Sequence, residues 1–77
     1  MPILYVETGS QSCERVLLAA DEIDIDLELR NIADPGIAEE LLLHGGMRLV
    51  PYLVDEEQGI ALYESDDIIR CLHERFS

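Results

Sequence analysis

Residues 49–63 read LVPYLVDEEQGIALY, two apolar runs on either side of a short polar turn. The turn, residues 55–59, is too short for a crossover connection, so the runs starting at Tyr52 and Ile60 must form an antiparallel hairpin. Pro51 has no amide to donate to a ladder, which suits the first residue of a strand, and an X-Pro bond adopts the cis isomer at little cost. The backbone of Val50 is thereby left unpaired and available to a ligand.

A helix is expected directly after this hairpin. Ser65 precedes two aspartates and then apolar residues at helical spacing, Ile68, Ile69 and Leu72. This pattern predicts Ser65 as the N-cap, carboxylates in the first turn, and a helix that runs to about Arg75. Because the first amides of a helix have no partner within it, they form a seat for an anion.

The residues upstream predict four further elements before the hairpin. Residues 3–6 are a continuous apolar run, typical of a central strand covered on both faces. Apolar residues fall on one face of a helix from about Ser10 to Ile23, and residues 25–30 alternate as a strand with one solvated face. Strand, helix and strand imply a right-handed parallel crossover. Asp34-Pro35-Gly36 then predicts an Asp34 N-cap with Pro at the first helical position, before a short helix over 37–44.

Size, charge and cysteine count limit the class of protein. A chain of 77 residues supports one domain, residues 1–77. The net charge of −12 makes nucleic acid and anionic membranes poor partners. Two cysteines and two histidines are too few for a disulfide scaffold or a zinc site, so we expect no metal and a reducing cytoplasm. No apolar stretch approaches the length needed to span a membrane.

The predicted order βαβαββα resembles the thioredoxin fold in its minimal glutaredoxin form. Val50-Pro51, Glu64-Ser65 and the helical apolar spacing after them resemble the glutathione-binding half of glutaredoxins and of the N-terminal domain of glutathione S-transferases. The resemblance covers essentially the whole chain and implies an α/β fold with a four-stranded mixed sheet. It also implies a cis bond before Pro51 that exposes Val50 to the cysteinyl part of glutathione, and a Glu64-Ser65 pair that holds the γ-glutamyl end.

The resemblance suggests two more contacts with glutathione, each with an ordinary alternative. Arg48 is one of few cations near the predicted pocket, and it either pairs with the glycyl carboxylate or serves only at the surface. Asp66 either meets the ammonium group of the ligand or is explained by its place at a helix start.

The reactive position of these families corresponds to Ser10-Gln11-Ser12-Cys13, at the start of the first helix. Glutaredoxins carry Cys-X-X-Cys here, whereas this chain has Ser10 in place of the nucleophile and keeps only Cys13. Ser10 either hydrogen-bonds a glutathione thiolate or caps the helix, and one residue can do both. Cys13 falls on the apolar face one turn inside the helix, so we expect a core residue, and we expect Cys71 to be partly buried against the sheet.

These observations favour a glutathione-binding glutaredoxin-like domain with weak or no thiol-disulfide oxidoreductase activity, which takes glutathione as ligand or co-substrate and has a protein disulfide as a conceivable substrate. A complete transferase needs an all-helical C-terminal domain, so we do not expect one from this chain alone. Two alternatives stay open. One is a non-enzymatic interaction module that pairs with a helical partner, and the other is a redox protein that acts through Cys13 alone.

Overall fold

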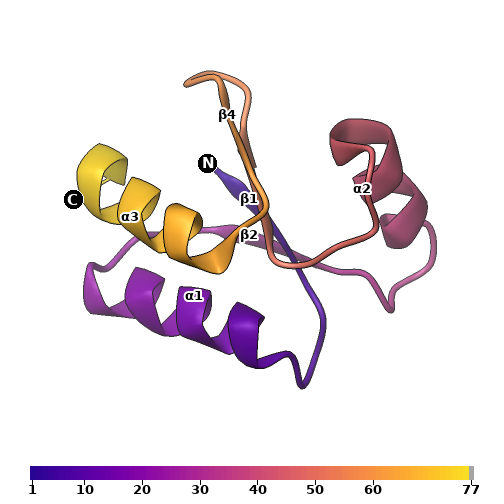
Figure 1. Ribbon diagram of the computed structural model, residues 1–77, viewed down its shortest axis with the longest axis horizontal. Coiled ribbons are helices and arrows are strands. Elements are labelled where there is room, and N and C mark those ends of the chain that lie inside the picture. Colours follow the sequence, from indigo (N-terminus) through magenta and orange to yellow (C-terminus); the bar gives the residue numbers. More distant parts are fainter. Residues whose placement is uncertain (77) are drawn as a thin grey trace.

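The computed structural model describes residues 1–76, which form a four-stranded sheet and three helices. In chain order the elements are β1 (Ile3–Val6), α1 (Gln11–Glu22), β2 (Glu28–Asn31), α2 (Ile37–Gly45), β3 (Tyr52–Asp55), β4 (Ile60–Leu62) and α3 (Ser65–Phe76). Figure 1 shows α1 and α3 side by side on one face of the sheet and α2 on the other. The predicted order βαβαββα is confirmed.

The sheet has the strand order β2-β1-β3-β4. β1 is parallel to β2 and antiparallel to β3, and β3 and β4 form an antiparallel hairpin. The mixed sheet, the parallel crossover and the hairpin are therefore as the sequence predicts. β1 is central, and its residues Leu4, Tyr5 and Val6 are all buried. The peptide bond between Val50 and Pro51 is cis.

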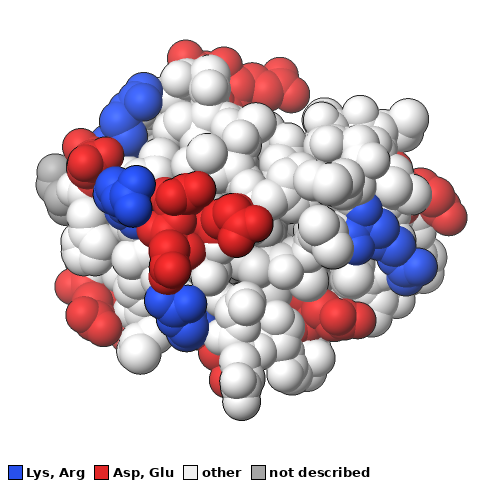
Figure 2. Space-filling view, in the orientation of Figure 1, with Lys and Arg blue, Asp and Glu red and all other residues white. Residues whose placement is uncertain are grey.

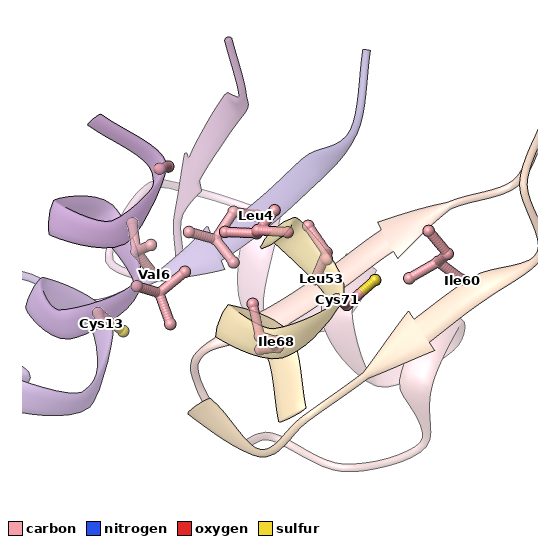
Figure 3. Close-up of a cluster of buried hydrophobic side chains, with 10 residues drawn as sticks. Leu4, Val6, Cys13, Leu53, Ile60, Ile68 and Cys71 are labelled. Atoms are coloured by element: carbon pink, nitrogen blue, oxygen red, sulfur yellow. The ribbon is translucent and has the colours of Figure 1, made fainter. Parts of the chain in front are cut away.

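Successive residues of the central strands point to opposite faces, so the sheet separates two apolar clusters. Leu4, Val6 and Leu53 pack against α1 and α3, as Figure 3 shows. Tyr5 points to the other face, where it packs with Tyr52 and the buried residues of α2 and its flanks. A short run that is apolar at every position is what a strand covered on both faces requires.

Helix α2 is held to the sheet by a polar contact as well as by packing. The hydroxyl of the fully buried Tyr5 donates to Oε1 of Glu40 on α2, at 2.8 Å. Glu40 is also paired with Arg30 of β2. Burial raises the pKa of Tyr5, so its hydroxyl remains a donor over the physiological pH range.

The second strand begins later than the alternation of residues 25–30 predicts. Asp24 has a left-handed φ of 59°, and the amide of Ile25 donates to the carbonyl of Ala20 at 3.0 Å. These residues turn the chain away from the end of α1, and only from Glu28 onward does the ladder with β1 form. The apolar side chains of Ile25 and Leu27 still pack against the α1 and α3 side of the core.

The predicted start of the second helix is wrong. Asp34 is not the N-cap and Pro35 is not the first helical residue, because the carbonyl of Asp34 accepts from the amide of Ile37 in a turn before the helix. The N-cap is Gly36, whose φ of 81° favours glycine, and it makes no side-chain cap. α2 ends at Gly45, one residue beyond the predicted end, and Gly46 is its left-handed C-cap, whose amide donates to the carbonyl of Leu42.

Candidate functional site

The strand register brings the predicted glutathione-binding segments to one edge of the sheet. Because β1 and β3 are antiparallel and Tyr5 is opposite Tyr52, the end of β1 lies beside the start of β3. β3 and β4 are also antiparallel, so the end of β4 lies at this edge too. α1 and α3 begin a few residues after these strand ends, and Figure 1 shows their first turns on the same side of the molecule. The segments that meet here contain Ser10, Val50, Pro51, Glu64 and Ser65.

Ser10 occupies the N-cap of α1. Its backbone is extended, with φ −77° and ψ 120°, and its Oγ accepts from the amide of Cys13 at 3.3 Å. Capping is thus one role of Ser10, as the sequence predicts. A hydroxyl that accepts one hydrogen bond still has its own hydrogen to donate, so the cap leaves Ser10 able to contact a ligand as well.

Cys13 is a core residue, as expected. Its side chain is 2% exposed and packs in the cluster between α1, α3 and the sheet (Figure 3). It borders a hollow of about 230 Å³, which is lined by residues 6–9 and by Glu14 and Leu17. Cys71 is also buried, and burial raises the pKa of its thiol. Both cysteines are free, and burial restricts the access that a nucleophilic thiol needs.

The start of α3 differs by one residue from the prediction. The carbonyl of Glu64 accepts from the amide of Ile68 at 2.8 Å, which makes Glu64 the N-cap and Ser65 the first helical residue. Asp66 and Asp67 lie in the first turn, as expected. The predicted N-cap role of Ser65 is therefore wrong.

The Ser65 side chain instead contacts Arg15, a residue of α1 that the sequence patterns do not single out. Arg15 Nη1 donates to Ser65 Oγ at 3.2 Å, and Nη2 pairs with Asp66 Oδ1 at 2.5 Å. Figure 2 shows acidic side chains gathered over the start of α3, with a basic side chain beside them. Arg15 is half exposed and its partners are some fifty residues away in sequence, so no local pattern predicts this contact.

Tyr63 fixes the segment that leads to Pro51. Its hydroxyl donates to the carbonyl of Met47 at 2.8 Å and accepts from the amide of the same residue at 3.1 Å. Its ring packs on Tyr52, with centroids 4.3 Å apart. The hydroxyl lies so close to α2 that a Cβ on Gly45 would be 1.9 Å from it. Tyr63 thus joins the segment before Pro51 to the residues that lead into Glu64.

The remaining predicted ligand residues lie in this segment and at the start of α3. Arg48 is exposed, Val50 is half-buried and Pro51 is buried. Asp66, for which the sequence suggests an ammonium contact, is paired with Arg15. Glu64 is exposed at the N-cap of α3. The residues expected to contact glutathione therefore come from three segments that the fold brings to one edge: the start of α1, the residues before β3 and the start of α3.

Among residues 1–76, no three His, Cys, Asp or Glu side chains are grouped so that they could hold a metal ion. Within the same residues, no helix has the length and apolar character needed to cross a membrane.

The chain matches the family model described as "Glutathione S-transferase, N-terminal domain" over residues 4–77. It therefore belongs to this family, and its thioredoxin-like fold is the fold of these domains. A comparison with curated proteins finds no match.

Solved structures of glutathione transferases are similar to the chain. A delta-class glutathione transferase of Nilaparvata lugens is 31% identical, with a TM-score of 0.82 over 100% of this chain and 37% of that one. A glutathione S-transferase of the Antarctic clam Laternula elliptica is 29% identical, with a TM-score of 0.81 over 97% of this chain and 35% of that one.

A third similar structure contains a ligand. It is a glutathione S-transferase from Methylobacillus flagellatus with glutathione bound, 27% identical, with a TM-score of 0.78 over 97% of this chain and 37% of that one. The chain spans between 35% and 37% of the length of these three proteins.

Proposed function

We propose that residues 1–77 form a single domain that binds glutathione at the sheet edge where α1, the segment before Pro51 and α3 meet. The observation that carries this proposal is the strand register, which brings the end of β1, the start of β3 and the end of β4 together. The similar Methylobacillus flagellatus transferase, solved with glutathione bound, supports the choice of ligand.

Each part of glutathione has a chemically suitable partner in the proposal. The backbone of Val50, next to the cis bond, pairs with the cysteinyl part, and Arg48 pairs with the glycyl carboxylate. The α-carboxylate of the γ-glutamyl part accepts hydrogen bonds from the first amides of α3 and from the Ser65 hydroxyl, since helix N-termini favour anions. Glu64 meets its ammonium group, and Asp66, for which the sequence suggests the same contact, is paired with Arg15 instead.

We further propose that thiol-disulfide oxidoreductase activity toward protein disulfides is weak or absent. Ser10 stands where glutaredoxins have the nucleophilic cysteine, and a hydroxyl needs an adjacent base to act as a nucleophile near neutral pH. Cys13 is too buried to take over this role, which speaks against a redox function through Cys13 alone. The proposed location is a reducing cytoplasm, because two cysteines are too few for the disulfide scaffold of a small secreted domain.

The test is a titration of the ¹⁵N-labelled protein with reduced glutathione, followed by amide NMR. We expect saturable shifts at Ser10, Val50, Glu64, Ser65 and Asp66 together, because one ligand at the edge touches all of these segments. Shifts confined to the turn at residues 55–59 or to α2 would contradict the proposal, and so would the absence of saturable shifts.

One observation favours the second candidate function, an interaction module. Leu43 of α2 is 87% exposed, and Leu42, Met47 and Leu49 are also exposed nearby in sequence. Exposed apolar residues that gather on a surface mark an interaction site in many proteins, and a helical partner would cover them. If the protein binds no glutathione but forms a complex through these residues, the interaction module is the better description.

A further inference from the structure

We infer that Arg15 is a positioning residue for the γ-glutamyl carboxylate of glutathione. It prepares Ser65 as a hydrogen-bond donor and neutralises Asp66 beside the place where that carboxylate binds. This inference rests on the proposed function and adds a residue that lies outside the predicted ligand set.

The contact with Arg15 determines where the hydroxyl hydrogen of Ser65 points. Ser65 is the first residue of α3 rather than its N-cap, so its Oγ is not engaged by the helix amides. Oγ accepts from Arg15 Nη1 at 3.2 Å. Because a guanidinium can only donate, the hydroxyl hydrogen must point away from Arg15 and is available to an acceptor. The positive charge of Arg15 also strengthens this hydroxyl as a donor to an anion.

Arg15 also offsets negative charge at the start of α3. Glu64, Asp66 and Asp67 place three carboxylates at the start of α3, on a chain whose net charge is −12. Carboxylates at this position are stabilised by the positive end of the helix dipole. They also repel the α-carboxylate of a ligand that binds the first amides of the same helix. Arg15 Nη2 pairs with Asp66 Oδ1 at 2.5 Å, so it cancels the charge that adjoins Ser65.

A second arginine, Arg70 of α3, pairs with another carboxylate in the first turn of this helix. Arg70 pairs with Asp67 at 3.6 Å, and its side chain is 67% exposed. It therefore offers a matched control, because replacing it also removes an arginine that pairs with a carboxylate in the first turn of α3, without touching Ser65.

The experiment compares two ligands with four proteins. The ligands are reduced glutathione and its analogue in which a 4-aminobutanoyl group replaces the γ-glutamyl group, so that only the α-carboxylate is missing. The proteins are the wild type, Arg15→Gln, Arg15→Lys and Arg70→Gln. Calorimetric or NMR titration gives each Kd, and circular dichroism verifies that each variant is folded.

We expect Arg15→Gln to raise the Kd for glutathione by about fivefold, the upper range for an exposed charged contact. The Kd for the analogue should stay within about twofold, because the analogue lacks the group that Arg15 serves. Arg15→Lys should show an intermediate loss of affinity for glutathione, since an ammonium keeps the charge but cannot donate to Ser65 and Asp66 from two separate nitrogens. Arg70→Gln should change neither Kd by more than about twofold.

A further variant tests directly whether the unpaired charge of Asp66 weakens binding. In the Arg15→Gln protein, Asp66→Asn removes the carboxylate left without its partner, and we expect it to restore part of the affinity for glutathione.

The outcomes separate this inference from the proposed function. A wild-type protein that binds no glutathione refutes the proposed function, and the role of Arg15 with it. Glutathione binding by the wild type that Arg15→Gln leaves unchanged refutes only the role of Arg15. An equal loss for both ligands would also refute it, because it would show that Arg15 merely holds α1 and α3 together.

Discussion

The close approach of Tyr63 to Gly45 makes a strong prediction about stability. Gly45 is in the last turn of α2, where a helical residue other than glycine is normally the better choice. Alanine is favoured over glycine within a helix by about 1 kcal/mol. Propensity alone therefore predicts that Gly45→Ala stabilises the protein.

The packing of Tyr63 predicts the opposite result. A Cβ at position 45 would lie 1.9 Å from the Tyr63 hydroxyl oxygen, 2.7 Å from its Cζ and 3.2 Å from Cζ of Tyr52. The Tyr63 ring must then move, which breaks two hydrogen bonds to Met47, worth about 1 kcal/mol each, and weakens an aromatic contact worth about 1 kcal/mol. After subtraction of the gain in helix propensity, we expect Gly45→Ala to destabilise the protein by about 2 kcal/mol.

The assay is urea unfolding followed by circular dichroism, with Gly45→Ala made in both the wild type and a Tyr63→Ala background. In the wild type, a loss of about 2 kcal/mol corresponds to a fall in Tm of about 10 °C for a domain of this size. Without the Tyr63 ring the clash is removed, so the same change should be neutral or stabilising by up to about 1 kcal/mol. A similar effect of Gly45→Ala in the two backgrounds would refute the reasoning.

Two further predictions concern the sulfur chemistry. Ser10→Cys should raise the rate of glutathione-linked disulfide reduction on the order of 100-fold over a poor wild type, because it restores a thiol at a helix N-terminus; a wild type that is already fast, and that Cys13→Ser inactivates, would show that Cys13 is the nucleophile. Cys13 and Cys71 should react with a thiol reagent at least about tenfold more slowly in the native protein than in concentrated urea, because both are buried. The raised pKa of Cys71 should shift the onset of its native labelling to higher pH, and native labelling as fast as that of the unfolded chain would contradict the burial.

The sequence predicts the elements of this fold well because their signals are local. An apolar run at residues 3–6, a turn at residues 55–59 and an apolar helical face after Ser10 each restrict a segment to one type of structure. The errors also have local causes. Asp34 is a better N-cap than glycine by propensity, yet the chain turns at Gly36 with a positive φ, and the helix starts after it.

The residues of the candidate site also differ in whether a local signal predicts them. Ser10, Val50, Pro51 and Glu64-Ser65 are found from short motifs, and the register then brings their segments to one edge. Arg15 and Gly45 are not found, because their roles depend on residues 50 and 18 positions away: Ser65 in one case and Tyr63 in the other. The sequence around a polar residue on an exposed helix face does not indicate which distant residue it will contact in the folded protein.

The contacts of Tyr63 and of Arg15 act on the same short segment from opposite sides. Tyr63 precedes Glu64 and is fixed to Met47, so it connects the start of α3 with the segment before Pro51. Arg15 connects the start of α3 with α1, one to two turns after Ser10. Since every segment of the proposed glutathione site is joined to Glu64-Ser65 by one of these contacts, loosening either should also alter the part of the site at its other end. Arg15 variants should therefore perturb the amide of Ser10 in NMR spectra, and Tyr63→Phe should perturb that of Val50.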